Sequence, residues 1–80
     1  MNTAVKIKEL IEFYTNIRVK KYRMFKRNGI WVIVLEVDLD DGEISDEFDS
    51  ASPDLSDKID KLNFDLVDYI SGKLYFEENF

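Results

Sequence analysis

The alternation of hydrophobic and polar positions is clearest in residues 30–39, which begin as the most apolar run of the chain and end in acidic residues. Successive side chains of a β-strand point to opposite sides, so every second residue shares a face. One face of this segment is apolar throughout, whereas the other carries Glu36 and Asp38 near its end. The pattern predicts a central strand with one face in the core and the acidic end of the other face open to water.

The preceding segment, residues 17–27, is predicted to pair with this strand. The Asn28-Gly29 dipeptide between the two is typical of a two-residue hairpin turn, which needs positive φ twice. Such a turn also sets the register, and it places Lys21 opposite Glu36 as a cross-strand pair of opposite charge.

Two segments carry the spacing of an amphipathic helix. Residues 3–15 place apolar side chains at intervals of three and four, with Phe13 outside the apolar stripe and therefore exposed. The second predicted helix follows Ser52, a good N-cap before Pro53, and runs to about Ser71. Its apolar stripe runs from Leu55 to Ile70.

Between the central strand and the second helix, Asp40-Asp41-Gly42 is predicted to form a second hairpin turn, followed by an edge strand over residues 43–49. Ile44 and Phe48 then extend the core face. The expected fold is a single α+β domain over residues 1–80: a two-layer α-β-β-β-α arrangement with a three-stranded antiparallel sheet. The pattern does not distinguish helix from strand for the tail, residues 73–80.

Composition restricts the possible functions of the chain more than it restricts the possible folds. The chain has 80 residues with 45% hydrophobic content, enough for one folded domain. It contains no cysteine and no histidine, which removes thiolate chemistry and the commonest general base and metal ligand. No cofactor or metal site is expected, and the chain is predicted not to be an enzyme. It has no apolar run of membrane-spanning length and no signal-peptide pattern, so a cytoplasmic location is expected.

The loop around Gly42 differs from the calcium-binding loop of an EF-hand. With Gly42 at the sixth position of the loop, Val37, Leu39 and Phe48 stand where oxygen ligands are required. The spacing therefore excludes an EF-hand.

Charge is strongly segregated along the chain, which has a net charge of −6. Residues 1–27 hold eight Lys/Arg and two Glu, whereas residues 28–80 hold three Lys and fifteen Asp/Glu. Solubility alone does not require segregated charge, so the pattern favours a charged binding surface.

The acidic residues are predicted to gather on one surface, formed by the outer face of the second hairpin and the outer face of the second helix. Like charges placed directly opposite one another destabilise a sheet, unless solvent or a cationic partner screens them. The candidate partner-binding residues are Glu36, Asp38, Asp40, Glu43, Glu47, Asp49, Asp54, Asp57 and Asp60, with Phe64 as an exposed aromatic among them.

Three stretches, VKIKELIEF, WVIVLEVDLDDGEISDEF and the Asp-rich segment after Pro53, resemble small acidic phage proteins of the anti-CRISPR kind. The similarity is one of pattern and composition. It implies a non-enzymatic inhibitor that presents carboxylates to the basic, nucleic-acid-binding site of a partner protein. The resemblance implies the DNA-binding groove of an RNA-guided nuclease as the target. By the same electrostatics, a restriction enzyme, a recombinase or a basic toxin is an alternative target, and a membrane is not expected as a partner.

Two alternatives remain from the residues. The basic segment 18–27 interleaves Tyr22 and Phe25 with Lys and Arg, as a nucleic-acid contact does. The predicted element order also resembles the double-stranded RNA-binding domain, but Asp54 and Asp57 stand where that family needs lysines, so direct nucleic-acid binding is disfavoured. A structural or assembly subunit, with Phe13, Phe64 and the tail in a homodimer contact, is the other alternative.

Overall fold

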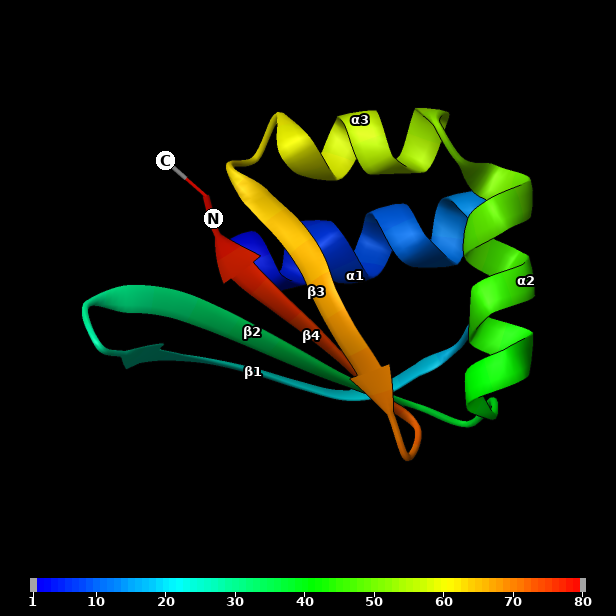
Figure 1. The fold of residues 1–80 in the computed structure, drawn as a ribbon, viewed down its shortest axis with the longest axis horizontal. Coiled ribbons are helices and arrows are strands. Elements are labelled where there is room, and N and C mark those ends of the chain that lie inside the picture. The colour runs from blue at the N-terminus through cyan, green and yellow to red at the C-terminus, as the bar shows by residue number, and fades with distance from the viewer. Residues whose placement is uncertain (1, 80) are drawn as a thin grey trace.

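The computed structural model describes residues 2–79 and has an α+β fold, as the sequence predicts, with a layer of helices on one face of an antiparallel sheet (Figure 1). The elements in chain order are α1 (Thr3–Tyr14), β1 (Val19–Arg27), β2 (Ile30–Val37), α2 (Asp41–Ala51), α3 (Asp54–Asp60), β3 (Phe64–Ile70) and β4 (Lys73–Glu78).

The sheet has four strands in the order β1-β2-β4-β3, and each neighbouring pair is antiparallel. The first hairpin is confirmed, because Asn28 and Gly29 both have positive φ and Lys21 pairs with Glu36. The central position of β2 is also confirmed. Its second neighbour, however, is β4 from the C-terminal tail, whose conformation the sequence left open.

The hydrophobic core lies between the sheet and the helices. In Figure 1, α1 and α3 run alongside one another over the sheet, and α2 crosses at their ends. The opposite face of the sheet has no helix on it (Figure 1), yet Val32 and Val34 on that face are only 1% and 3% exposed. The core cluster comprises Ala4, Ile7, Ile11, Ile17, Ile33, Leu35, Val37, Ile44, Leu55, Ile59, Phe64, Leu74 and Phe76.

The predicted third strand over residues 43–49 is wrong, because this segment belongs to the helix α2. Asp40 is the N-cap residue, and its Oδ1 accepts a hydrogen bond from the Glu43 backbone N–H at 2.8 Å. The Glu43 side chain accepts in return from the Asp40 N–H, which completes a capping box. Ile44 and Phe48 are spaced equally well for a strand face and for a helical stripe, so their spacing alone did not decide between the two.

The predicted long helix over residues 53–71 is also wrong, because the chain forms the short helix α3 and then the strand β3. Asn63 adopts a positive φ of 66° between them. Ser71 and Gly72, predicted to end a helix, instead form a hairpin turn between β3 and β4 with positive φ at both residues.

Two further expectations change with this correction. Phe64, predicted to be exposed, is 4% exposed and belongs to the core. Ser52, predicted to begin a helix, lies at the end of α2, where its N–H donates to the Phe48 carbonyl at 2.9 Å, and the Ser52–Pro53 peptide is cis. The tail forms β4 as far as Glu78, and Phe80 lies outside the described residues.

The helix α1 agrees with its prediction. The Asn2 side chain caps its start by accepting a hydrogen bond from the Ala4 N–H at 2.8 Å. Phe13 faces away from the core and is 80% exposed.

Candidate functional site

The structure places most of the predicted acidic residues on two consecutive helices, whereas the sequence predicted a hairpin for those before residue 50 and a helix for the others. Asp40, Glu43, Glu47 and Asp49 belong to α2 or its N-cap, and Asp54, Asp57 and Asp60 belong to α3. Asp41 and Asp46, which the sequence reading left out of the site, join them on α2. We define the α2–α3 acidic surface as Asp40, Asp41, Glu43, Asp46, Glu47, Asp49, Asp54, Asp57 and Asp60.

Three predicted site residues do not join this surface. Glu36 lies on β2 and points to the face of the sheet that has no helix, where it pairs with Lys21 and Lys73 on the neighbouring strands. Asp38 is exposed in the connection between β2 and α2. Phe64 is buried and therefore unavailable to a partner.

Four of the nine carboxylates have a structural role within the fold. Asp40 and Glu43 form the capping box of α2. Glu47 Oε1 accepts a hydrogen bond from the Asn16 backbone N–H at 2.6 Å, which joins α2 to the chain after α1. Asp60 Oδ1 accepts from the Asn79 side-chain amide at 3.3 Å.

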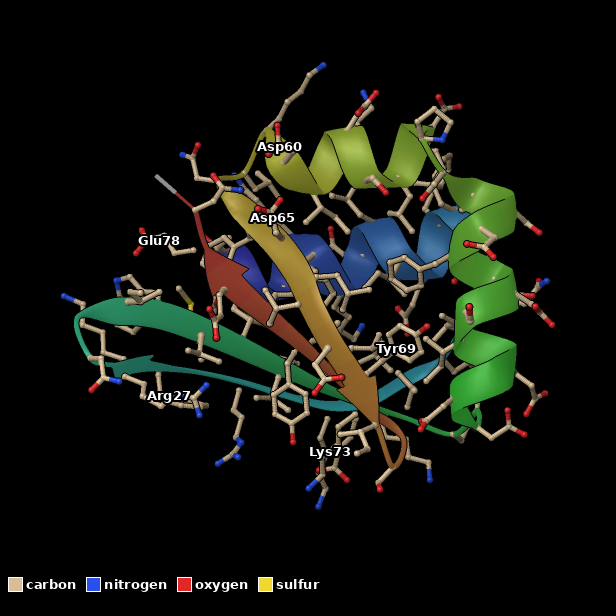
Figure 2. The ribbon with its side chains drawn as sticks, viewed as in Figure 1. Arg27, Asp60, Asp65, Tyr69, Lys73 and Glu78 are labelled. Carbon is tan, nitrogen blue, oxygen red and sulfur yellow. The ribbon has the colours of Figure 1, made fainter. Side chains whose placement is uncertain are left out.

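The remaining five carboxylates have no such role. Asp41, Asp46, Asp49, Asp54 and Asp57 are all exposed, and their side chains make no hydrogen bond with any other residue among positions 2–79. Figure 2 shows oxygen-tipped side chains projecting from α2 and α3 into solvent. These five charges are free to meet a partner without breaking a contact inside the molecule.

No ion pair within residues 2–79 involves a carboxylate of this surface. The two ion pairs found there join Lys8 to Glu12 at 3.1 Å and Arg27 to Glu77 at 3.6 Å. Lys58 on α3 is the single basic residue between positions 38 and 60, against the nine carboxylates of the surface. The surface therefore has a large net negative charge.

The acidic surface is not arranged as a metal centre. Within residues 2–79, no group of three Asp or Glu side chains lies close enough to hold a metal ion. On an exposed surface at high dielectric, these carboxylates act as fixed charges that attract cationic groups from a distance.

The basic residues of the N-terminal segment gather on β1, which forms one edge of the sheet. The side chains of Lys21, Arg23 and Arg27 share the helix-free face, and the Arg23 guanidinium lies over the Phe25 ring at 5.2 Å. Lys26 lies over Trp31 at 5.4 Å on the other face. The edge strand at the opposite side of the sheet, β3, carries Asp65 and Asp68, so the charge segregation of the sequence becomes a spatial one.

Two local signals in the sequence indicate the observed arrangement better than the hydrophobic spacing does. Asp40 followed by Glu43 is the pattern of a capping box, and it indicates a helix start rather than the predicted Asp-Gly turn. Ser71-Gly72 is a turn dipeptide of the same class as Asn28-Gly29. Together, these two signals would have placed the acidic residues on helices and added the fourth strand.

Comparisons with known proteins found no significant similarity to this chain. No protein-family model matches the chain, and neither the search of curated proteins nor that of solved structures found a significant match. Among the helices of residues 2–79, none has the length and apolar character needed to cross a membrane.

Proposed function

We propose that this protein is a non-enzymatic binding protein whose α2–α3 acidic surface occupies a basic, nucleic-acid-binding site of a partner protein. The observation that carries this proposal is the concentration of nine carboxylates on two consecutive helices with no internal ion pair. Unpaired like charges held close together repel one another, so the surface gains most from a cationic partner.

The charge density of α2 supports a surface that competes with nucleic acid. Six carboxylates lie between Asp40 and Asp49, which at about 1.5 Å of rise per residue span about 15 Å of helix. This is roughly one charge per 2.5 Å, comparable with the value of about one per 1.7 Å for double-stranded DNA. A groove that binds phosphates through Lys and Arg would therefore attract α2 by the same physical interaction.

By this proposal, the protein is an inhibitor of the anti-CRISPR-like or other anti-defence kind, since it would exclude nucleic acid from the partner's groove. The long-range field speeds the encounter with a basic partner, and the fixed positions of the helix carboxylates select the partner's geometry. The partner class is thus a protein with a nucleic-acid-binding groove, and the binding is sensitive to salt.

Affinity capture from a host lysate at low salt tests the proposal. The neutralised variant carries Asp46→Asn, Asp49→Asn, Asp54→Asn and Asp57→Asn, four changes that remove charge without removing a hydrogen bond of the fold. The control carries Asp→Glu at the same four positions, which keeps every charge.

We expect the wild type and the Glu control to retain the same nucleic-acid-binding protein, and the neutralised variant to retain about tenfold less or none. Added DNA should displace the captured protein from the wild type. Equal retention by the neutralised variant, or a captured protein that DNA does not displace, would refute the proposal.

A further inference from the structure

The helix-free face of the sheet carries a second arrangement of charge, separate from the α2–α3 acidic surface. The strand registers define three rows across the sheet, each with one residue from β1, β2, β4 and β3 in that order. The rows are Phe25-Val32-Glu77-Asp65, Arg23-Val34-Tyr75-Asp68 and Lys21-Glu36-Lys73-Ile70.

The face is basic at its β1 edge and acidic at its β3 edge, and the two middle strands carry apolar and charged positions together: Val32, Val34, Tyr75, Glu36, Lys73 and Glu77. Lys21 and Arg23 lie on β1, whereas Asp65 and Asp68 lie on β3. Arg27 and Lys73 point away from the helices in Figure 2. Ile70, at the end of β3, is 52% exposed although it is a large apolar side chain. An open sheet face of this kind is suited to contact another surface.

Most of the charges of this face have no ion-pair partner within the described chain. The ion pair between Arg27 and Glu77 is the one formed here, and it leaves Arg23 and Asp68 without an oppositely charged side chain within 4.0 Å. The two lie at opposite ends of the middle row, separated by Val34 and Tyr75. A partner that forms ion pairs with both Arg23 and Asp68 must be acidic over β1 and basic over β3.

We propose that the occupant of this face is a second copy of the same chain, stacked face to face about a twofold axis that runs parallel to the strands. Such an axis, placed between β2 and β4, lays β1 of each copy over β3 of the other. The same surface of both copies then forms the interface, and its basic edge contacts the acidic edge of the other copy, as a twofold interface requires.

The strand registers give the contacts of this dimer. In the middle row, Arg23 of each copy lies over Asp68 of the other, and Val34 lies over Tyr75. In the adjacent row, Glu36 lies over Lys73 of the other copy. Packed sheets cross at about 30°, so contacts are closest in the middle row. The dimer is therefore held by two Arg23–Asp68 pairs that flank the two half-buried Tyr75 side chains, since Val34 is already buried within each copy.

The charge pattern excludes the other simple stackings. A twofold axis perpendicular to the strands would lay β1 over β1 and β3 over β3, which places like charges together. Nucleic acid would gain from β1 but would be repelled by Asp65 and Asp68 on the same face. A second copy in the first orientation pairs Arg23 with Asp68 at both edges, whereas Lys21 lies over Ile70 and Phe25 lies over Asp65.

The size of the face limits the strength of the dimer. Four strands about 4.8 Å apart and three rows about 6.6 Å apart outline about 400 Å² of sheet per copy. This is below the roughly 800 Å² per partner of a standard stable interface. We therefore expect a reversible, concentration-dependent dimer that weakens as salt increases.

Dimerisation would also change the surface available to other partners. Stacking covers the basic side chains of Lys21 and Arg23 and leaves the α2–α3 acidic surface of each copy outward. The inference is independent of the proposed function, because it rests on different residues and a different face.

Sedimentation velocity of the full chain over a range of concentrations, with a charge-swap series, tests the dimer. The variants are Arg23→Glu, Asp68→Arg and the two combined, and Lys6→Glu on α1 is the control for a charge reversal elsewhere. Circular dichroism of each variant confirms that the fold is retained.

We expect the wild type and Lys6→Glu to dimerise, each single variant at the face to weaken the dimer about tenfold or more, and the double variant to restore it. A wild type that stays monomeric at the highest concentration, or a double variant no better than the singles, would overturn the proposal. A third result would also overturn the proposal: the wild type binds DNA, Arg23→Glu abolishes this binding, and the double variant does not restore it.

Discussion

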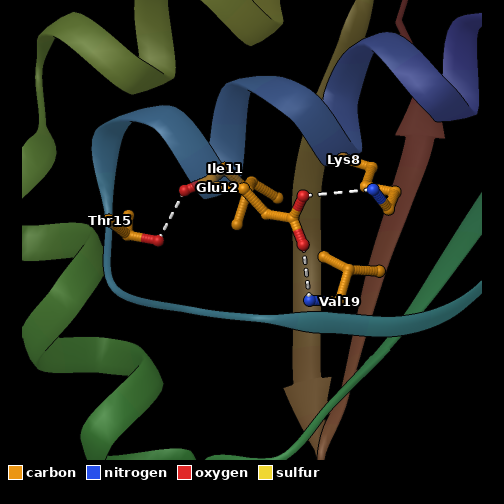
Figure 3. A network of polar contacts seen from close by, with 5 residues as sticks. All are labelled: Lys8, Ile11, Glu12, Thr15 and Val19. Carbon is orange, nitrogen blue, oxygen red and sulfur yellow. Dashed lines mark hydrogen bonds and ion pairs between the residues drawn. The ribbon is translucent and has the colours of Figure 1, made fainter.

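Glu12 connects the end of α1 to the start of β1 through both carboxylate oxygens (Figure 3). Its Oε2 accepts a hydrogen bond from the Val19 backbone N–H at 3.0 Å, and its Oε1 pairs with Lys8 Nζ at 3.1 Å. The Val19 N–H lowers the pKa of Glu12 below its ordinary value of 4.5, against the opposing effect of burial, and the charges of Lys8 and Arg18 lower it further. The ionised carboxylate therefore stabilises the folded state.

The first prediction follows from this lowered pKa. A carboxyl whose pKa is lower in the folded state stabilises the protein above its unfolded-state pKa, and this stabilisation disappears as pH falls through the folded-state pKa. We expect Glu12→Gln to lower the free energy of unfolding by up to about 1 kcal/mol at neutral pH, because the side chain is partly exposed. The loss should be much smaller in acid below the lowered folded-state pKa of Glu12.

Urea unfolding at the two pH values measures the effect of Glu12→Gln. Glu9→Gln is the control, since the Glu9 side chain makes no hydrogen bond or ion pair with the described residues. An equal loss of stability at both pH values would contradict the assigned role of the Glu12 charge.

The second prediction concerns two glycines in hairpin turns. Gly29 and Gly72 both have positive φ, at 79° and 73°. A Cβ on Gly72 would lie 3.1 Å from the Val37 carbonyl oxygen, whereas a Cβ on Gly29 would meet nothing within 4 Å. We expect Gly29→Ala to cost about 1 kcal/mol of stability and Gly72→Ala about 2 kcal/mol, because only the second adds a steric conflict to the strained φ.

Thermal or urea unfolding of the two glycine variants gives the comparison directly. Equal losses would mean that the approach of Gly72 to Val37 has no energetic consequence. A larger loss in Gly29→Ala would contradict the turn geometry.

At the scale of elements, turn and capping residues determine whether a segment forms a helix or a strand where the hydrophobic spacing fits both. Ile44 and Phe48 fit a strand face and a helical stripe equally well, and the capping box of Asp40 and Glu43 gives the helix. The apolar series from Leu55 to Ile70 fits one helix, but Asn63 at positive φ separates α3 from β3. The first helix and hairpin were predictable because spacing and end signals there agree.

The candidate site was predictable in part for the same reason. The acidic character of residues 40–60 is a property of composition, and it holds whichever elements those residues form. The helix-free face was not predictable, because it needs β3 and β4, which bring Asp68 and Tyr75 into one row with Arg23. The Ser71-Gly72 turn pairs β3 with β4, but no local pattern predicts that β4 lies beside β2.

The third prediction tests the corrected position of Phe64 on β3. Phe64 is buried in the core, whereas Phe13 on α1 is 80% exposed. We expect Phe64→Ala to lower the free energy of unfolding by about 3 kcal/mol or more through lost burial and a cavity, and Phe13→Ala to change it by less than about 0.5 kcal/mol. Similar losses in urea unfolding for the two variants would contradict the β3 assignment.

At the scale of the whole molecule, the fold converts charge segregation along the chain into two separate surfaces. The helices α2 and α3 carry a large net negative charge, and the helix-free face of the sheet carries opposite charges at its two edges. We propose a partner protein for the first surface and a second copy of the chain for the other. Both associations depend on electrostatic attraction between exposed groups, so both weaken as salt increases.

The measurement that tests the proposed function most directly is the salt dependence of the affinity for the captured partner, compared between the wild type and the variant with Asp46, Asp49, Asp54 and Asp57 changed to Asn. We expect the wild-type affinity to fall steeply between low and moderate salt, and the variant to bind weakly with a much shallower slope. The Glu control should follow the wild type. Equal affinities and equal slopes for the wild type and the Asn variant would show that the α2–α3 acidic surface is not the binding surface.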